Sequence, residues 1–392
     1  MEKRKNLFTS ESVSEGHPDK LCDRIADAIL DARLAKSPSS RTAVEVRATR
    51  ERIIISGEVS SDVSVDYEKI ARDVVREIGY TTPESGIGAD TRKVEVYIDQ
   101  QSPDIAQGVN SSLDLHSIGP GDQGIMFGYA TDETENYMPL PIVMAHKLVR
   151  YATNLRKSGA LSFARPDMKS QVTIDYSDKD PKVNAVVFSC QHKPDTDREY
   201  LRKIIKEKVI LPVIDSFHIN RDGLEEFYIN PTGRFEIGGP KGDTGLTGRK
   251  IIVDTYGGSA PHGGGSFSGK DPTKVDRTAA YAARYAAKNI VAAKLCDKCL
   301  IELSYAIGVS KPVSISVETF GTEHVDKEKI LAALCNEEIF DFTPGGIIKF
   351  FSLTKPSFRY QDLSAYGHFG RPDLNLPWEK LDKVEILKRF CF

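Results

Sequence analysis

The chain has 392 residues, 40% of them hydrophobic and 28% charged, which is typical of a globular protein with two or three domains or one repeat assembly. Its 53 basic and 56 acidic residues give a net charge of -3, so we expect neither nucleic acid nor a membrane as a partner. No apolar run approaches the roughly 18 residues of a membrane-spanning helix. The start from Met1 to Lys5 lacks a signal-peptide core and the six cysteines are scattered, so we expect a cytoplasmic location.

The first predicted element is a helix that begins at Pro18, because apolar residues from Leu21 onward recur on one face. Alternating patterns at 42–49 and 52–60 predict two strands. An amphipathic helix at about 67–78 and a strand at 94–98 follow. The order is therefore helix, two strands, helix, strand.

The same order recurs in the middle of the chain. A helix is predicted to begin at Pro139, and strands are predicted at 170–176 and 183–191. A helix at 201–209 and a strand at 227–229 complete the second set.

A third set follows the glycine-rich segment near residue 265. It consists of a long alanine-rich helix from about Pro272, strands at 300–306 and 313–319, and a helix at 327–334. We predict a last strand at 347–350, which would complete the pattern.

A proline opens the first helix of each set, at intervals of about 120–135 residues, which indicates three units of one topology. We predict an α+β fold, an α/β sandwich of three similar domains in which helices cover mostly antiparallel sheets. The alternative is coincidence within a long α+β chain. The expected boundaries are 1–102, 125–232 and 233–392, with 103–124 as a mobile active-site loop.

The glycine-rich segment 263–272 is the most informative motif. From Gly264 to Lys270 it reads Gly-x-x-x-x-Gly-Lys, close to a phosphate-binding P-loop, but Asp271 stands where Ser or Thr would hold Mg²⁺. Asp271 suits an N-cap and Pro272 a first helical position, so we predict that a helix begins there and that the preceding backbone binds an oxyanion. The metal ligand should then lie elsewhere.

A second glycine-rich loop, 240–250, ends with an Arg-Lys pair. Together with Lys270 and Lys274 it places several cations near one loop, so a polyphosphate site is the favoured interpretation. Solvated turns and a solvated helix face are the alternative. The segment 119–124 fits Gly-x-Gly-x-x-Gly, but it lacks the preceding strand and following helix of a dinucleotide site.

The assembled motifs resemble the S-adenosylmethionine synthetase family. They are Gly-His-Pro-Asp-Lys at 16–20, Gly-Asp-Gln-Gly at 121–124, Gly-Leu-Thr-Gly-Arg-Lys at 245–250 and Gly-Gly-Gly-Ser-Phe-Ser-Gly-Lys-Asp at 263–271, and the likeness runs from Phe8 to about Trp378. The resemblance implies pseudo-threefold symmetry and a homodimer or dimer of dimers with active sites shared between subunits.

The resemblance also implies the reaction. Methionine sulfur would attack C5′ of ATP to give S-adenosylmethionine, and the bound triphosphate would be hydrolysed to phosphate and pyrophosphate. Sulfur carries no proton, so no general base is required. The departing triphosphate needs preorganised cations and metal ions. Two Mg²⁺ ions per site and one K⁺ ion are expected.

Carried over by position, the resemblance assigns roles to individual residues. Catalytic contacts are expected from His17, Lys169, Lys250, Lys270 and Asp122, the last facing the developing sulfonium. ATP is expected to contact His17, Asp167, Lys169, Arg234, Phe235, Asp243, Arg249, Lys250, Ser266 and Lys270. Methionine is expected to contact Glu58, Gln101, Asp243 and Lys274. The expected metal ligands are Asp19 and Asp276, with Glu11 as a weaker candidate, and Glu45 for K⁺.

Two departures from the family pattern remain. Ser266 stands where the family usually has Ala, and 161–164 differs from the common Leu-Pro-Trp-Leu. Neither removes a charged group, so we expect these departures to affect only nucleotide packing and affinity. The alternative hypotheses for the function are a non-catalytic nucleotide-binding regulatory subunit of the same family and a P-loop kinase or NTPase.

Overall fold

The computed structural model of the chain describes residues 5–100, 119–221, 224 and 226–392. Its strands form three sheets, which we call the N-terminal, central and C-terminal sheets. Their orders are β4-β3-β2-β9, β1-β6-β7-β8 and β11-β10-β5. All neighbouring strands pair antiparallel except β3 with β4 and β7 with β8. The predicted α+β fold with mostly antiparallel sheets is therefore confirmed.

The N-terminal sheet packs against two helices. Its elements are β2 (Arg41–Ala48), β3 (Arg52–Ser60), β4 (Lys93–Asp99), β9 (Gly245–Leu246), α1 (Pro18–Lys36) and α2 (Tyr67–Ile78). Along β2, Val44 and Val46 are buried whereas Glu45 and Arg47 are exposed. The alternation of a strand thus turns one face to the helices and leaves charged residues on the other.

The central sheet is built in the same way. Its elements are β1 (Leu7–Val13), β6 (Ala164–Asp175), β7 (Lys182–His192), β8 (Glu226–Ile229), α4 (Leu140–Lys157), α5 (Arg198–Ile205) and α6 (Leu211–Asp215). A π-helical turn at Lys206–Ile210 joins α5 to α6. Helix α4 contributes Met144, Leu148 and other apolar side chains to the core beneath β6 and β7.

The C-terminal sheet has the largest helical cover. Its elements are β5 (Gly124–Thr131), β10 (Lys298–Tyr305), β11 (Ser314–Glu318), α8 (Val275–Ala292), α9 (Lys327–Leu334), α10 (Pro344–Phe350) and α11 (Val384–Cys391), and the short α7 (Ile251–Asp254) precedes α8. Helix α8 lies directly on β5, because a Cβ at Gly128 would meet the backbone of Ala283 at 2.0 Å.

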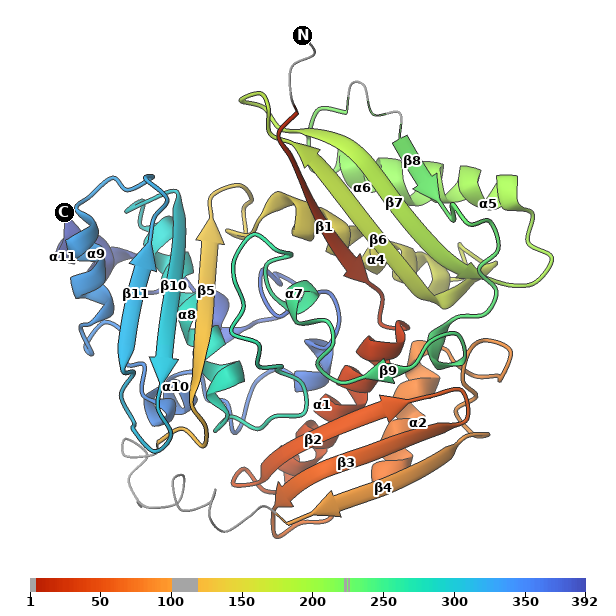
Figure 1. The fold of residues 1–392 in the computed structure, drawn as a ribbon, viewed down its shortest axis with the longest axis horizontal. Coiled ribbons are helices and arrows are strands. Elements are labelled where there is room, and N and C mark those ends of the chain that lie inside the picture. Colours follow the sequence, from red (N-terminus) through yellow and green to blue (C-terminus); the bar gives the residue numbers. More distant parts are fainter. Residues whose placement is uncertain (1–4, 101–118, 222–223, 225) are drawn as a thin grey trace.

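The three sheets exchange strands in a cycle (Figure 1). Strand β1 precedes α1 in the chain but pairs with β6 of the central sheet. Strand β5 precedes α4 but pairs with β10 of the C-terminal sheet. Strand β9 precedes α8 but pairs with β2 of the N-terminal sheet. The first strand of each unit therefore pairs in the sheet of the next unit, and the first strand of the third unit pairs in the sheet of the first. The domain boundaries proposed above stay a prediction.

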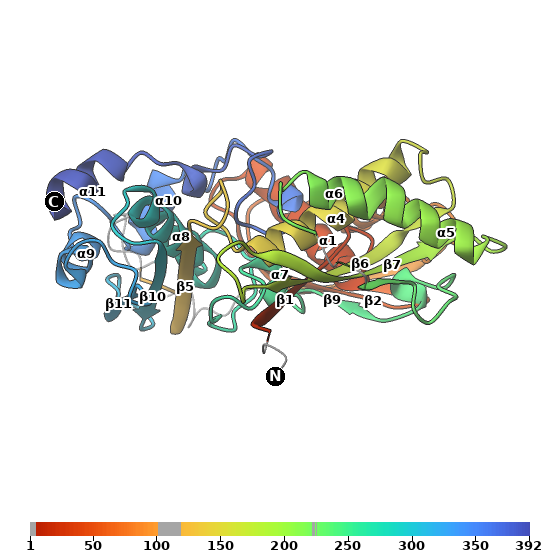
Figure 2. The same ribbon diagram turned by 90° about the horizontal axis from the view of Figure 1, so that it is seen from above.

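Figure 2 shows the strands along one side of the molecule and most helices, including α4, α6 and α11, on the other. The helices bury one face of each sheet, and the opposite face has no helical cover within the described residues. Polar residues of β2, β3 and β6, among them Glu45, Glu58 and Lys169, are exposed. No described helix is long and apolar enough to cross a membrane.

Two predicted elements were wrong. Helix α8 begins at Val275 and not at Pro272, because the Asp271 carboxylate accepts hydrogen bonds from Thr42 N of β2 and Thr273 N, at 2.7 and 2.9 Å, in place of capping the helix. The strand predicted at 347–350 is the helix α10. Thr343 caps α10 by accepting from Gly346 N, with proline at the first position, a start signal that the sequence contained.

Candidate active site

Helix α1 begins at Pro18, directly after His17, and its first turn forms the buried end of the site. His17 is the N-cap, and its Nδ1 accepts from Asp19 N at 3.1 Å. Burial and the nearby charges of Lys250 and Lys169 lower the pKa of His17 to about 3, so the imidazole is neutral at physiological pH. Because Nδ1 acts as an acceptor, Nε2 carries the proton and can donate it in a hydrogen bond.

Asp19 ties α1 to the loop around β9. Its Oδ1 accepts from Leu246 N at 3.0 Å and its Oδ2 from Lys250 Nζ at 2.6 Å. Burial opposes ionisation, but the hydrogen bonds from Lys250 and Leu246 outweigh it and lower the pKa of Asp19. A buried carboxylate and a lysine thus form an ion pair beside the neutral His17. We call His17, Asp19 and Lys250 the buried cluster.

Lys270 and Asp276 form a second ion pair, more exposed than the first. Lys270 Nζ lies 2.7 Å from Asp276 Oδ2, and about a quarter of each side chain is exposed. The backbone of the glycine-rich segment passes so close that a Cβ at Gly265 would meet Asp276 Oδ1 at 2.1 Å. We call Lys270 and Asp276 the open cluster.

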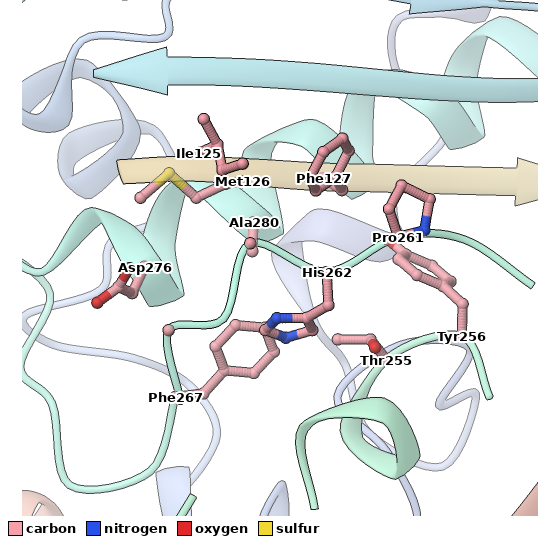
Figure 3. Close-up of a pocket in the computed structure, with 12 residues that line it drawn as sticks. Ile125, Met126, Phe127, Thr255, Tyr256, Pro261, His262, Phe267, Asp276 and Ala280 are labelled. Carbon is pink, nitrogen blue, oxygen red and sulfur yellow. The ribbon is translucent and has the colours of Figure 1, made fainter. Parts of the chain in front are cut away.

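Figure 3 shows Asp276 at the edge of a hollow between β5 and the glycine-rich segment. The hollow is lined by Ile125, Met126, Phe127, Tyr256, His262 and Phe267, among others. The two clusters are connected through Ser266, because a Cβ at Gly248 would lie 2.5 Å from Ser266 Cβ. The loop that carries Lys250 therefore packs on the loop that carries Lys270.

Asp167 on β6 extends the site beyond the buried cluster. Its Oδ2 accepts from Gly239 N at 2.8 Å, whereas its buried Oδ1 has no hydrogen-bond partner among the described residues. Burial raises the pKa of Asp167 to about 6, against the opposing charge of Lys169. A buried acceptor without a donor is costly, so this oxygen suits a ligand that brings a donor.

The remaining predicted residues lie at the surface or outside the described part of the chain. Glu11, Glu45, Glu58, Asp122, Lys169, Arg234, Asp243 and Arg249 are exposed, and Phe235 and Lys274 are half-buried. Lys274 Nζ pairs with Asp271 Oδ2. Gln101 and most of the predicted mobile loop, 103–118, lie outside the described residues.

Comparison with known proteins agrees with these motifs. The S-adenosylmethionine synthetase N-terminal, central and C-terminal domains match residues 5–103, 117–235 and 237–380. The chain belongs to the S-adenosylmethionine synthetase family. It is 53% identical to an S-adenosylmethionine synthase of Clostridium botulinum over 98% of this chain and 100% of the relative. It is 55% identical to the enzymes of that name from Mesoplasma florum and Mycoplasma mycoides, each over 98% of this chain and over 100% and 97% of the relative.

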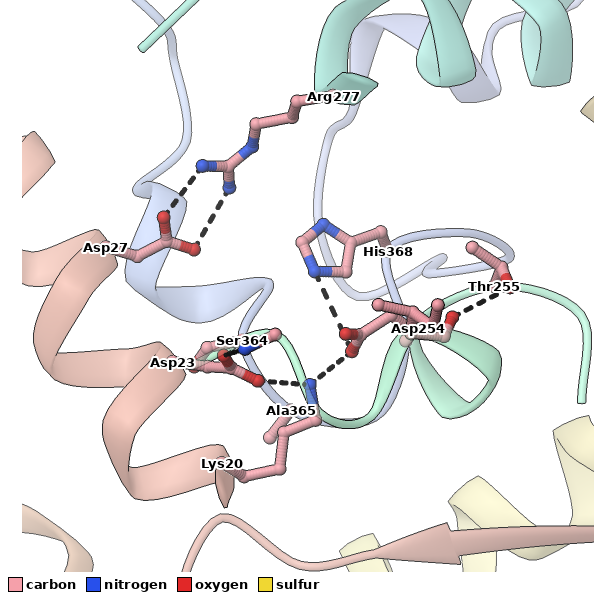
Figure 4. A network of polar contacts seen from close by, with 12 residues as sticks. Lys20, Asp23, Asp27, Asp254, Thr255, Arg277, Ser364, Ala365 and His368 are labelled. Carbon is pink, nitrogen blue, oxygen red and sulfur yellow. Dashed lines mark hydrogen bonds and ion pairs between the residues drawn. The ribbon is translucent and has the colours of Figure 1, made fainter. Parts of the chain in front are cut away.

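Sequence reasoning missed a buried ionic network behind both clusters in this family member (Figure 4). Lys20 Nζ lies between Asp23, at 2.8 Å, and Asp254. Arg277 of α8 donates to both carboxylate oxygens of Asp27, at 2.7 and 3.0 Å. The signal was present, because aspartates recur every four residues along α1, a spacing that places side chains on one helix face.

Proposed function

We propose that this chain makes S-adenosylmethionine from ATP and L-methionine, as the names of its relatives indicate, and that the buried and open clusters bind the triphosphate. The observation that carries the residue assignment is the pair of lysine–carboxylate contacts at glycine-rich loops, Lys250–Asp19 and Lys270–Asp276. Each loop brings one cation and faces one carboxylate. A polyphosphate with bound Mg²⁺ has negative phosphate oxygens that match the lysines and a positive metal ion that matches the carboxylates.

The two ion pairs suit an exchange of partners. With a metal–triphosphate bound, the lysines would contact phosphate oxygens, and Asp19 and Asp276 would hold the metal. Each buried charge then exchanges one opposite charge for another, so the site avoids the cost of an unpaired buried ion. In this proposal Arg249, Lys169 and Ser266 also contact phosphate.

His17 is proposed to contact the triphosphate near the bond that breaks. Its neutral imidazole can donate from Nε2 to the triphosphate oxygen on which charge develops as the bond from C5′ to that oxygen breaks. It adds no positive charge of its own. The nearby ammonium groups of Lys250 and Lys169 supply the electrostatic stabilisation. No base is required, because the attacking thioether sulfur carries no proton.

The adenosine end is proposed to lie along β6 and the 234–243 segment. The free Oδ1 of Asp167 would accept from a hydroxyl or amino group of the nucleoside. Phe235, Arg234 and Asp243 are proposed to contact ATP in the same region. Methionine is proposed to contact Glu58, Gln101, Asp243 and Lys274, and Asp122 to face the sulfonium.

Mg²⁺ fits the donor set of Asp19 and Asp276, because it prefers carboxylate oxygens and commonly takes only one or two of them besides phosphate and water. Within the described residues, no three potential metal ligands gather in one group. Substrate phosphates would therefore complete the coordination of two Mg²⁺ ions, with Glu11 as a further ligand. When bound, Mg²⁺ neutralises charge on the leaving triphosphate. Glu45 is proposed for K⁺.

We further propose a homodimer or dimer of dimers in which each active site is shared, so that the buried cluster of one chain and the open cluster of its partner bind the same triphosphate. The face of the sheets opposite the helices has no helical cover in the described part of the chain, and it carries Glu45, Glu58 and Lys169 (Figure 2). Ile125 of β5 is 45% exposed beside the open cluster, which suits burial by a second copy. All six cysteines are free, which agrees with the proposed cytoplasmic location.

A product analysis tests the reaction. Methionine-dependent release of phosphate and pyrophosphate from ATP, with S-adenosylmethionine formed in equal amount, is the expected result. ADP as the nucleotide product would indicate a kinase or NTPase. Absence of turnover, with ATP still bound, would indicate a regulatory subunit.

Subunit exchange tests the shared site. Asp19→Asn and Asp276→Asn should each be nearly inactive alone. If the two carboxylates of one site come from different chains, a mixed dimer has one site with both substitutions and one with neither, so about half of the activity per mixed dimer returns. Absence of recovery after demonstrated exchange would show that both carboxylates come from one chain.

A further inference from the structure

Lys20, in the first turn of helix α1, is a buried cation that belongs to neither cluster. Its side chain has no exposed surface, and its Nζ lies between Asp23, at 2.8 Å, and Asp254 of α7 (Figure 4). Burial opposes the charge, but the two carboxylates outweigh it and raise the pKa of Lys20, so the amine stays protonated. Because apolar residues often replace a buried ion pair without loss of stability, this costly arrangement favours a role besides stability.

The two partners of Lys20 hold the ends of one loop segment, from Gly248 to Asp254, which we call the Lys250 segment. At its start, Asp23 Oδ1 accepts a hydrogen bond from Gly248 N at 2.8 Å. At its end, Asp254 is the last residue of α7, and its backbone N donates to Lys250 O at 2.9 Å. Because Lys20 binds both carboxylates, the segment is fastened to α1 before and after Lys250.

The Lys250 segment begins with a sharp turn. Gly248 has a φ angle of +79°, in the left-handed region that favours glycine, and it precedes Lys250 by two residues. From this turn the Lys250 side chain reaches Asp19 Oδ2 at 2.6 Å, about one helical turn before Asp23 on α1. The place of the Lys250 ammonium therefore depends on how the two ends of the segment are held.

We propose that Lys20 is a positioning residue, which fixes the Lys250 ammonium within the buried cluster by holding both ends of the Lys250 segment. Every group in this arrangement belongs to the buried cluster or lies directly behind it in the same chain. Lys20 therefore serves one active site, even where that site is shared between subunits. The inference rests on the proposed function, because that function assigns Lys250 to the triphosphate. Misplacement of a catalytic group by about 1 Å can cost on the order of 10²-fold in rate.

The first test compares the removal of two buried lysines. Lys20→Met removes the ammonium at the centre of the network. The matched control, Lys288→Met, removes a buried ammonium from Glu379, which lies in neither cluster and keeps its contact with Arg284. At saturating ATP and methionine, kcat per folded molecule should fall at least about tenfold in Lys20→Met and stay within about twofold in Lys288→Met. Equal kcat values for the two variants would overturn the proposal.

Lys20→Arg takes the place of Lys20→Met if the latter does not fold. It keeps the charge between the two carboxylates, but a planar guanidinium on a longer side chain cannot occupy the place of an ammonium without moving them. Lys20→Arg should therefore fold and lose kcat several-fold. Wild-type kcat in the folded Lys20→Arg protein would then overturn the proposal.

Double variants show whether Lys20 acts through Lys250. If it does, Lys20→Met should add little to the loss in Lys250→Met but should lower kcat of Lys270→Met by its full factor. The same factor in both backgrounds would mean that Lys20 acts only on general stability, which would overturn the proposal.

Subunit exchange shows whether the damage is confined to the buried cluster. With shared sites, a mixed dimer of Lys20→Met and Asp276→Asn chains has both substitutions at one site and an intact second site, so about half of the activity per mixed dimer should return. A mixed dimer of Lys20→Met and Asp19→Asn chains has one substitution at each site and should not recover. If Asp19→Asn and Asp276→Asn complement each other but Lys20→Met and Asp276→Asn do not, the whole Lys20→Met chain is impaired and the positioning role is wrong.

These outcomes separate the positioning role from the proposed function. If Lys250→Met retains wild-type kcat, the assignment of Lys250 to the triphosphate is wrong, and the role of Lys20 falls with it. If Asp19→Asn and Asp276→Asn do not complement each other, the shared site is wrong, and the double variants still decide the role of Lys20. If Lys250→Met loses activity and Lys20→Met does not, only the positioning proposal fails.

Discussion

The buried and open clusters contain the same kind of contact in different surroundings. Lys250 and Asp19 lie 2.6 Å apart and Lys270 and Asp276 lie 2.7 Å apart, yet the Asp19 side chain is 4% exposed and that of Asp276 is 28% exposed. The two lysines are about equally exposed, at 22% and 24%, so the difference lies in the carboxylates, and the pair with the buried carboxylate is screened less by water. The buried cluster should couple catalysis to stability, whereas the open cluster should affect catalysis alone.

The largest expected effects come from Lys250→Met and Lys270→Met. Each removes a cation from the leaving group, so kcat should fall by about 10²–10³ with a smaller change in ATP binding. Lys250→Met should also lower the free energy of unfolding by about 1–3 kcal/mol, because buried Asp19 loses its partner. Lys270→Met should lower it by about 0–1 kcal/mol. Steady-state kinetics and denaturant unfolding measure both quantities, and equal stability losses would contradict the comparison.

Gly265→Ala should disturb the open cluster alone. The new methyl group would overlap Asp276, and the flexible carboxylate can move aside without a change of fold. We expect the Mg²⁺ concentration for half-maximal rate to rise at least about tenfold, with an unchanged melting temperature. In the control Gly124→Ala the added methyl would displace only the flexible end of Met126, 2.7 Å away, and would lie 3.6 Å from the same Asp276 oxygen, so its effect on the Mg²⁺ requirement should be smaller. A Mg²⁺ requirement that matches wild type in Gly265→Ala would count against Asp276 as a ligand.

The smallest expected effect concerns His17. Its pKa in the folded chain is about 3, below the ordinary value of 6.5, so the unfolded chain binds more protons between these values. His17 therefore contributes stability above about pH 6.5 that is lost as the pH falls toward 3. Lys250→Met should raise the pKa of His17 and Lys270→Met should not, which an NMR titration of the imidazole can follow. A rise in both variants would mean that the two clusters share one electrostatic environment.

Local signals made much of the fold predictable. Pro18 and the apolar spacing after it place α1, and alternation places β2 and β3, because short-range preferences and burial agree there. The predicted start of α8 was wrong because the Asp271 side chain binds Thr42 of β2, a residue more than 200 positions away in the chain. The exchange of strands between the sheets could not be predicted from the sequence either, because β9 has only two residues and produces no periodic pattern.

Prediction of the site had a similar limit. Glycine-rich loops and lysines indicated phosphate chemistry, and the family resemblance supplied roles that stay predictions until tested. The pairing of Lys250 with Asp19, and the depressed pKa of His17, depend on how β9 docks onto α1. The four-residue spacing of the aspartates on α1 was visible in the sequence, but only the structure shows which backbone amides donate hydrogen bonds to them.

The cyclic exchange of strands has a consequence for synthesis on the ribosome. The edge strand β9 can join the N-terminal sheet only after residue 246 has emerged from the ribosome. Strand β5 remains unpaired until its partner β10, which starts at Lys298, has been made. Until then β2 exposes an unpaired edge, the kind of surface that favours aggregation. The N-terminal unit therefore cannot mature first, as an independent domain would, whereas the central sheet has all four strands once β8 has emerged. A nascent chain of this protein must stay incomplete for most of its translation, and a fragment cut at any of the predicted boundaries would lack a strand that belongs to its own sheet.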